Sequence, residues 1–156
     1  MKNKIKKSFL LDVDGVMTDG SYFYDESGKI MKKFGAHDHD GLKLVKDLFD
    51  ISFITADKRG FEISKKRIVD DMGFQLNLVT ESERFEYVIK NFDLNNLIFM
   101  GDGFYDAKVL KECFLGIAPK SANKHAIKNA DYITESSGGY GAVFDACYYL
   151  KKKFSK

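Results

Sequence analysis

Short apolar runs alternate along this chain with longer segments whose apolar residues recur at helical spacing. The expected strands lie at residues 8–11, 51–54, 74–79 and 97–100, with edge strands at 114–118 and 132–134. The expected helices lie at about 40–49, 61–72, 82–91, 107–112 and 142–154. Strands that alternate with helices are joined by crossover connections, so the pattern predicts an α/β fold with a doubly wound parallel sheet.

The first apolar run ends in two carboxylates one residue apart, Asp12 and Asp14, followed by Gly15. Alternate side chains of a strand point the same way, so Asp12 and Asp14 share a direction while Val13 packs the other way. Two like charges this close are costly unless a cation lies between them. Ligands of open parallel sheets bind beyond the carboxyl ends of the strands, so chemistry is expected at this edge. The alternative is a turn whose aspartates only cap a following helix.

Two further apolar runs end in oxygen-bearing side chains. Gly101 and Asp102 follow the run 97–100, with Asp106 four residues later, and Thr55 ends the run that begins at Ile51. Carboxylates and a hydroxyl suit a hard cation such as Mg²⁺. Phosphoryl transfer needs a nucleophile, a metal ion, a hydroxyl and a cationic side chain, so these strand ends predict phosphoryl chemistry.

These motifs resemble those of the haloacid dehalogenase superfamily of phosphatases. The matching residues are Asp12-Val13-Asp14-Gly15-Val16, Thr55, and Gly101-Asp102 with Asp106. A narrower resemblance, to the capless 3-deoxy-D-manno-octulosonate 8-phosphate phosphatases, rests on residues 14–20, 22–34, Asp38 with Gly41, and 138–143. It implies a Rossmann-like fold with an inserted β-hairpin and no cap domain, and Mg²⁺ as the cofactor.

The resemblance gives each motif residue an expected role. Asp12 is the nucleophile that forms an aspartyl phosphate, and Asp14 is the acid that protonates the leaving alkoxide and then the base for water. The expected Mg²⁺ ligands are Asp12, Asp102 and the main-chain carbonyl of Asp14. Thr55 is expected to hydrogen-bond a phosphoryl oxygen. In isolation, Thr55 would indicate only β propensity, and Asp102 and Asp106 only helix capping.

The catalytic cation departs from the family pattern. The family has a lysine at the start of the helix after the fourth strand, and the equivalent position here is Arg84. Arginine is always charged and forks onto oxygens, so Arg84 is expected to serve. The alternative is a solvated Arg84, with Lys58 or Lys90 supplying the charge. Gly103 is a second departure, because the family has an acid there that orients its neighbours.

The residues expected around the substrate are Asp38, His37 and Asp57. Asp57 lies where octulosonate phosphatases carry arginine and nine-carbon relatives glutamate. The expected substrate is 3-deoxy-D-manno-octulosonate 8-phosphate, with a nine-carbon acid 9-phosphate or another small sugar or alcohol phosphate as alternatives. His37 and His39 flank Asp38 and invite a zinc interpretation, but such a cluster at a helix start is more typical of a cap with solvated imidazoles.

Aromatic residues beside the expected site have two interpretations. Most of the chain's Phe and Tyr residues fall at helical or strand-alternating positions, which is typical of a core. Phe104 and Tyr105 directly follow the Asp102-Gly103 pair, and they are expected to line the pocket mouth.

Composition indicates one compact enzyme domain over residues 1–156. Hydrophobic residues make up 44% of the chain, enough for one core. The net charge of +2 comes from scattered residues without a sustained basic block, so neither nucleic acid nor a membrane is an expected partner. Cys113 and Cys147 are too isolated for a zinc site and are expected to be free thiols in a reducing cytoplasm.

A β-hairpin is expected after the first strand, because residues 21–24 and 29–34 flank the turn-like Asp25-Glu26-Ser27-Gly28. A chain without a cap domain leaves its metal site open to water. The resemblance therefore implies a homotetramer in which the hairpin packs centrally and a neighbour covers each site. The expected contact face is apolar and consists of Tyr22, Tyr24, Ile30 and Phe34.

Two non-phosphatase alternatives remain. A receiver domain also gathers two aspartates, a Thr and a Lys on such a sheet, but it lacks the Asp12-to-Val16 motif and the hairpin. Steady release of phosphate, as opposed to one stable phosphorylation, distinguishes the two. A non-catalytic scaffold is favoured by Arg84 and Gly103, and the presence of the other motif residues weighs against it.

Overall fold

The computed structural model describes residues 6–155 and contains one parallel sheet. Its strands are β1 (Lys7–Asp12), β4 (Phe49–Thr55), β5 (Gln75–Leu78), β6 (Leu97–Met100), β7 (Leu115–Ala118) and β8 (Tyr132–Ile133). They are arranged in the order β5-β4-β1-β6-β7-β8, and each neighbouring pair is parallel. The predicted parallel sheet is therefore confirmed.

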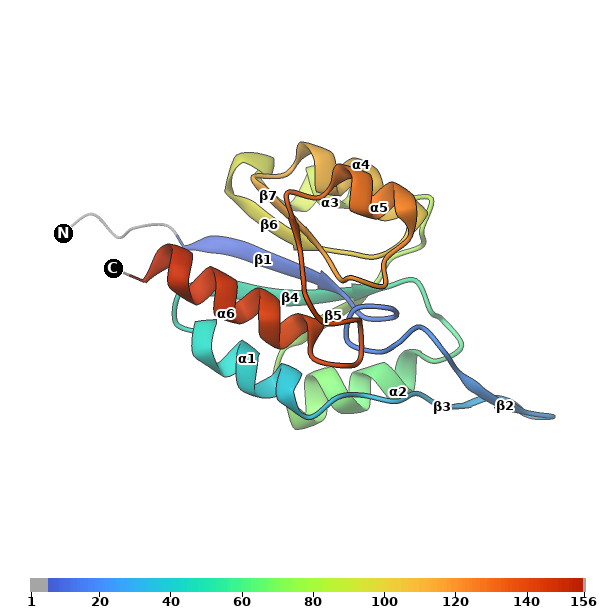
Figure 1. Cartoon of the computed structure of the whole chain (residues 1–156). Coiled ribbons are helices and arrows are strands. Elements are labelled where there is room, and N and C mark those ends of the chain that lie inside the picture. The colour runs from blue at the N-terminus through green and yellow to red at the C-terminus, as the bar shows by residue number, and fades with distance from the viewer. Residues whose placement is uncertain (1–5, 156) are drawn as a thin grey trace.

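Helices cover both faces of this sheet (Figure 1). They are α1 (His37–Val45), α2 (Phe61–Lys65), α3 (Arg84–Asn91), α4 (Ala107–Glu112), α5 (Lys124–Asn129) and α6 (Ala142–Phe154). A π-helical segment, Lys66–Asp71, continues α2. Helices α1, α2 and α6 lie on one side of the sheet and α3, α4 and α5 on the other, which makes the sheet doubly wound. No cap domain is present among the described residues.

Each face of the sheet buries its own apolar cluster. Phe9 and Leu11 of β1 face the cluster that includes α1 and α6, whereas Leu10 faces the cluster that includes α3, α4 and α5. This alternation follows from the two-residue period of a strand. Burial of a side chain of this size contributes roughly 2 kcal/mol, so the two clusters hold β1 firmly at the centre of the sheet.

The strand order reverses at β1, which lies between β4 and β6. Asp12 is in register with Ile54 of β4, and Leu11 with Met100 of β6. The crevice of a doubly wound sheet opens at such a reversal, beyond the carboxyl ends of the strands. The fold therefore places Asp12 and the residues after Met100 at this crevice.

The predicted hairpin consists of β2 (Phe23–Asp25) and β3 (Gly28–Met31), which are antiparallel. It projects from the body of the molecule (Figure 1). Its exposed apolar residues are Tyr22, Phe23, Tyr24, Ile30 and Met31. The expectation that Phe34 shares this face is wrong, because Phe34 packs partly buried against the core.

Several element boundaries differ from the expectations. The helix expected over 40–49 begins at His37 and ends at Val45, and Phe49 opens β4 instead. Phe49 is buried and makes edge-to-face contacts with Phe9 and Phe154, so packing between distant segments sets its conformation. Helix α5 was not expected, and β7 lies inside the sheet rather than at its edge. None of the helices among residues 6–155 has the length and apolar character that a membrane crossing requires.

Candidate active site

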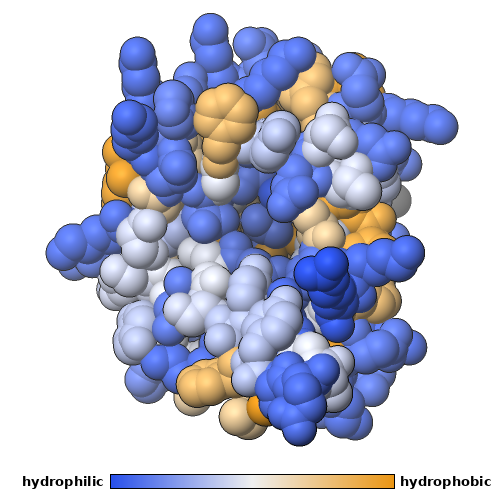
Figure 2. Space-filling model, turned by 90° about the vertical axis from the view of Figure 1, so that its right-hand side faces the viewer, coloured by the Kyte–Doolittle hydropathy of each residue, from blue (hydrophilic) through white to orange (hydrophobic). Residues whose placement is uncertain are grey.

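A cavity of about 470 Å³ opens at the carboxyl ends of the central strands. It is lined by Asp12, Asp14, Tyr22, Ala56, Asp57, Lys58, Arg59, Glu81, Arg84, Asp102, Gly103, Phe104 and Tyr105. Phe104 and Tyr105 thus line it as expected. Figure 2 looks onto the side of the molecule from which the hairpin projects, and this face is mostly hydrophilic with hydrophobic residues in separate patches. A polar or charged ligand suits such a surface better than an apolar one.

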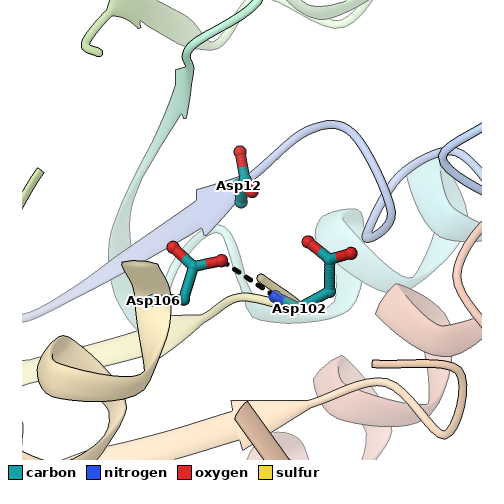
Figure 3. A group of neighbouring side chains, drawn as sticks. All are labelled: Asp12, Asp102 and Asp106. Atoms are coloured by element: carbon teal, nitrogen blue, oxygen red, sulfur yellow. Dashed lines mark hydrogen bonds between the residues drawn. The ribbon is translucent and has the colours of Figure 1, made fainter. Parts of the chain in front are cut away.

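Three carboxylates meet at the floor of this cavity. Oxygens of Asp12, Asp102 and Asp106 all lie within 4.8 Å of one another (Figure 3). Asp12 ends β1, Asp102 follows β6, and Asp106 comes directly before α4. Asp106 Oδ2 accepts hydrogen bonds from the backbone N–H groups of Asp102 and Gly103, at 3.0 and 2.9 Å. Asp106 therefore shapes the loop that presents Asp102.

The cation of the site is Arg84, the first residue of α3, which is only 3% exposed. Its Nη1 lies 2.6 Å from Asp106 Oδ1 and 3.1 Å from Asp12 Oδ2, and Nη2 lies 3.5 Å from Asp12 Oδ1. Lys58 borders the cavity, whereas Lys90 is exposed on α3. The alternative of a solvated Arg84 is therefore wrong.

Burial dominates the electrostatics of these groups. It raises the pKa of Asp12 well above the usual range, against the opposing effect of Arg84. Burial and the nearby Asp106 carboxylate raise the pKa of Asp102 to about 7. Burial alone would lower the pKa of Arg84, but Asp12 and Asp106 raise it overall. The guanidinium therefore stays charged, but its single positive charge does not balance the three carboxyl groups around it.

The donor set fits a divalent cation. Three carboxyl groups share one guanidinium here, and carboxylate oxygens suit a hard ion such as Mg²⁺. Asp12 and Asp106 each accept three hydrogen bonds, but only Asp12 and Asp102 of the three line the cavity, so these two are the carboxylates that a bound ion can reach. Gly15, at φ +84°, leaves room beside them, because a Cβ there would overlap the Asp102 carboxylate.

Asp14 lies apart from this cluster and is held at both carboxylate oxygens. Thr55 Oγ1 donates a hydrogen bond to Asp14 Oδ2 at 3.0 Å, and Lys32 Nζ forms an ion pair with Asp14 Oδ1 at 2.7 Å. Thr55 is fully buried and does not line the cavity. The structure thus places the Thr55 hydroxyl against Asp14, and its role toward a phosphoryl oxygen stays a prediction.

Asp57 borders the cavity, but protein groups surround its carboxylate. Its Oδ2 lies 2.6 Å from Lys29 Nζ and 2.7 Å from Lys32 Nζ, and its Oδ1 accepts a hydrogen bond from Gly60 N. Burial tends to raise the pKa of Asp57, but the two ammonium groups hold it below its usual value. Asp57 thus organises the loop after β4 with an ionised carboxylate.

Asp38 and His37, the other two residues expected around the substrate, do not line this cavity. Asp38 is fully buried, and its Oδ1 accepts a hydrogen bond from Phe144 N at the start of α6, at 3.2 Å. Burial raises the pKa of Asp38 to about 6. His37 is exposed on α1, outside the cavity lining. Within residues 6–155, the acidic cluster described above is the one grouping suited to a metal, so the zinc alternative at His37 and His39 has no support.

Two lysines of the hairpin, Lys29 and Lys32, were missed by the sequence reasoning. Their side chains are 4% and 0% exposed, although lysine is almost never buried unless it is paired. Nothing in the local sequence distinguishes them from Lys33, whose side chain is 53% exposed. Only their position relative to Asp14 and Asp57 reveals them.

Comparisons with known proteins agree with this geometry. A family model described as haloacid dehalogenase-like hydrolase matches residues 82–146. The 3-deoxy-D-manno-octulosonate 8-phosphate phosphatase of Escherichia coli K12 is 29% identical over 154 residues, covering 90% of this chain and 77% of that protein. The protein of that name from Haemophilus influenzae is 29% identical over 149 residues, covering 91% and 82%.

Solved structures extend the similarity to three dimensions. The 3-deoxy-D-manno-octulosonate 8-phosphate phosphatase of Moraxella catarrhalis, in complex with magnesium, phosphate and KDO, superposes with a TM-score of 0.78 at 25% identity, covering 94% of this chain and 86% of that one. A probable phosphatase from Pseudomonas syringae gives a TM-score of 0.84 at 25% identity, covering 96% and 87%.

Proposed function

We propose that this chain, which is a phosphatase of the haloacid dehalogenase superfamily, hydrolyses a phosphorylated 3-deoxy-2-ulosonic acid, with 3-deoxy-D-manno-octulosonate 8-phosphate as its substrate. The observation that carries the proposal is the buried Arg84 guanidinium, which bridges Asp12 and Asp106 beside a hydrophilic cavity. A permanent cation next to a carboxylate nucleophile is what transfer of an anionic phosphoryl group requires.

The reaction proceeds in two displacements. In the first, a carboxylate oxygen of Asp12 attacks phosphorus, the bond from phosphorus to the leaving oxygen breaks, and Asp14 gives that oxygen a proton. In the second, water attacks phosphorus, Asp14 takes a proton from the water, and the bond from phosphorus to Asp12 breaks. Arg84 holds the phosphoryl oxygens and keeps Asp12 aligned throughout.

Magnesium is the cofactor that the donor set supports. Asp12 and Asp102 would hold the ion through their carboxylates, and Asp14 would contribute its main-chain carbonyl. When bound, the ion would neutralise phosphoryl charge and favour the ionised form of Asp12 and Asp102, whose pKa burial raises. Arg84 alone does not balance three carboxylates beside a phosphate ester.

Two cations of the loop after β4 support an acidic substrate. Lys58 and Arg59 border the cavity and supply positive charge for a substrate carboxylate. The Asp57 carboxylate does not weaken the attraction of Lys58 and Arg59 for a substrate carboxylate, because Lys29 and Lys32 neutralise Asp57. This arrangement favours either sugar acid over a small neutral alcohol phosphate, and the similarity to octulosonate 8-phosphate phosphatases places the eight-carbon acid slightly ahead of a nine-carbon acid 9-phosphate.

A comparison of specificity constants tests the substrate. Purified protein with Mg²⁺ is assayed for phosphate release from octulosonate 8-phosphate, nonulosonate 9-phosphate and phosphoglycolate. The expected result is a kcat/KM for the eight-carbon acid at least about tenfold above that for phosphoglycolate, since a hydroxylated chain gains partners that a short ester lacks. Equal or better turnover of unrelated phosphates would show that the scaffold serves another reaction.

The matched control for the chemistry is Asp12→Asn. The amide keeps the shape of the side chain but neither attacks phosphorus nor holds Mg²⁺ as a charged ligand, so phosphate release is expected to fall by about a thousandfold or more. Excess chelator is expected to stop the wild-type enzyme in the same way. Substantial activity in either case would contradict the mechanism.

The remaining parts of the proposal concern its setting. The enzyme acts in the cytoplasm as one domain over residues 1–156 and serves carbohydrate biosynthesis, such as that of lipopolysaccharide. It works as a homotetramer in which the exposed apolar residues of the hairpin pack together. Their exposure in a single subunit supports this assembly, because contiguous apolar patches commonly mark contact surfaces.

A further inference from the structure

The hairpin carries an ammonium group into the interior of the site. Lys32 comes directly after β3, and its side chain is fully buried. Its Nζ lies 2.7 Å from Asp14 Oδ1, 2.7 Å from Asp57 Oδ2 and 2.8 Å from Ser64 Oγ. Three protein oxygens therefore surround this ammonium group: Ser64 Oγ accepts a hydrogen bond from it, and the two carboxylates form ion pairs with it.

Burial of this ammonium is tolerated because the charges around it balance. An unpaired buried charge would cost several kcal/mol. Here the two lysines Lys29 and Lys32 face two carboxylates, Asp14 and Asp57, in one connected group. The group joins three separate parts of the chain: the turn after β1, the hairpin and the loop after β4. The position of Asp14 is thus tied to the hairpin as well as to its own strand.

The Asp14 carboxyl group is restrained from both sides. Lys32 holds Oδ1, and the Thr55 hydroxyl holds Oδ2 at 3.0 Å. A carboxyl group bound at both oxygens cannot turn about its terminal torsion without breaking one contact.

We propose that Lys32 is a positioning residue, which fixes the Asp14 carboxyl group for proton transfer to the leaving oxygen. This inference rests on the proposed function, in which Asp14 is the acid and base. Lys32 forms and breaks no bond itself. It keeps Asp14 in one orientation while the phosphorus bond to the leaving group breaks and the proton moves from Asp14 to that oxygen. The hairpin thus serves the chemistry of its own subunit, in addition to any role in assembly.

The test compares two kinds of ester in Lys32→Met, a variant of similar volume without the charge. The value of kcat/KM reports the steps up to phosphoryl transfer to Asp12. An alkyl leaving group needs the proton of Asp14 in that step, whereas p-nitrophenolate leaves without one. For octulosonate 8-phosphate, kcat/KM is expected to fall by about tenfold or more, toward the lower end of general-acid effects. For p-nitrophenyl phosphate it is expected to fall less than about threefold.

Lys29→Met is the matched control. Lys29 lies in the same hairpin and contacts the same Asp57 oxygen, but it does not touch Asp14. Its removal is expected to leave the ratio of alkyl to aryl kcat/KM unchanged. If Lys32→Met does not fold, as judged by circular dichroism, Lys32→Gln keeps a hydrogen-bond donor without the charge and is expected to lower the ratio less. Equal losses on both esters, or no loss on either, would overturn the proposal.

Asp14→Asn separates failure of this proposal from failure of the proposed function. It is expected to show the same selective loss on the alkyl ester, only larger. If Asp14→Asn lowers kcat/KM equally for the alkyl and aryl esters, Asp14 is not the general acid, and the proposed role of Lys32 is also wrong. If the wild type does not hydrolyse octulosonate 8-phosphate, only the substrate assignment fails. The ratio is then measured with phosphoglycolate or whichever alkyl phosphate the wild type does hydrolyse.

Discussion

At the scale of single residues, charge pairing decides what each group in the site can do. Arg84 forms ion pairs with both Asp12 and Asp106, and its side chain is buried away from bulk water. Lys32 does the same for Asp14 and Asp57 on the other side of β1. The two cations thus divide the carboxylates into two groups, which in the proposed mechanism serve the phosphoryl centre and proton transfer.

Removal of the Arg84 charge tests the first of these groups. Arg84→Ala is expected to lower kcat/KM by a few hundredfold, about 3 kcal/mol, because it deletes a preorganised cation from the transition state. Arg84→Lys keeps the positive charge without the forked guanidinium and is expected to recover part of the lost kcat/KM. Steady-state kinetics at saturating Mg²⁺ measures both. Lys90→Ala, on the exposed side of the same helix, is the control, and near-normal turnover of Arg84→Ala would transfer the role to Lys58.

A buried carboxyl group outside the cavity gives a pH-dependent stability. Burial raises the pKa of Asp38 to about 6. The folded state therefore binds a proton more tightly than the unfolded chain, and stability present below about pH 4 is lost as pH rises through about 6. Relative to wild type, Asp38→Asn is expected to gain about 2 kcal/mol between pH 4 and pH 7.5. Urea unfolding at both pH values measures it, and a pH-independent difference between the two proteins would contradict it.

At the scale of elements, the turns at the ends of β1 and β3 decide where the site residues point. The turn after β1 folds back because the N–H groups of Val16, Met17 and Thr18 all donate to the Val13 carbonyl. A two-stranded hairpin has little stability of its own, so the base of β2 and β3 must be anchored elsewhere. Lys29 and Lys32 anchor it at Asp57 and Asp14.

Gly15→Ala tests the turn after β1. The φ of +84° disfavours any residue with a Cβ, and the new methyl group would overlap the Asp102 carboxylate. The expected result is a loss of activity and of Mg²⁺ affinity of about tenfold or more, with a folded protein. Gly28→Ala is the control, since φ is also positive there but nothing lies within 4 Å of its Cβ. Equal effects of the two substitutions would contradict the role of Gly15 in making room for Asp102.

At the scale of the whole molecule, both the open cavity and the exposed apolar residues of the hairpin bear on how subunits assemble. Phe23 and Tyr24 are 56% and 55% exposed at a place where a second subunit would cover them. A covered site excludes water and strengthens the electrostatic contacts within it. Activity is therefore expected to depend on assembly.

Light scattering tests the assembly. The expected mass at micromolar concentration is four times the 17.8 kDa of one chain. Phe23→Lys is expected to lower the mass and the activity together, because a charge on the contact face must be desolvated on association. Ile89→Lys changes an exposed apolar residue of α3 and is expected to keep the wild-type mass. A fully active wild-type monomer would contradict the tetramer.

Local patterns were sufficient to predict the parallel sheet, the hairpin and the carboxylates at the strand ends. These patterns are apolar runs of strand length, a four-residue turn, and acids at or just beyond the ends of β1 and β6. Because the carboxyl ends of parallel strands share one edge, Asp12 and Asp102 had to meet there. The role of Arg84 came from the resemblance to the phosphatase family, whose lysine lies at the equivalent position.

The tertiary structure alone decided which polar side chains are buried and what they contact. Lys32 is hydrogen-bonded to Ser64, which lies 32 positions away in the chain, and Asp38 to Phe144, which lies 106 positions away. Burial of such groups depends on charges and donors brought together by packing, and no local pattern distinguishes a buried lysine from a solvated one. For the same reason the hydrogen bond between Thr55 and Asp14, which lie 41 positions apart in the chain, was not predicted.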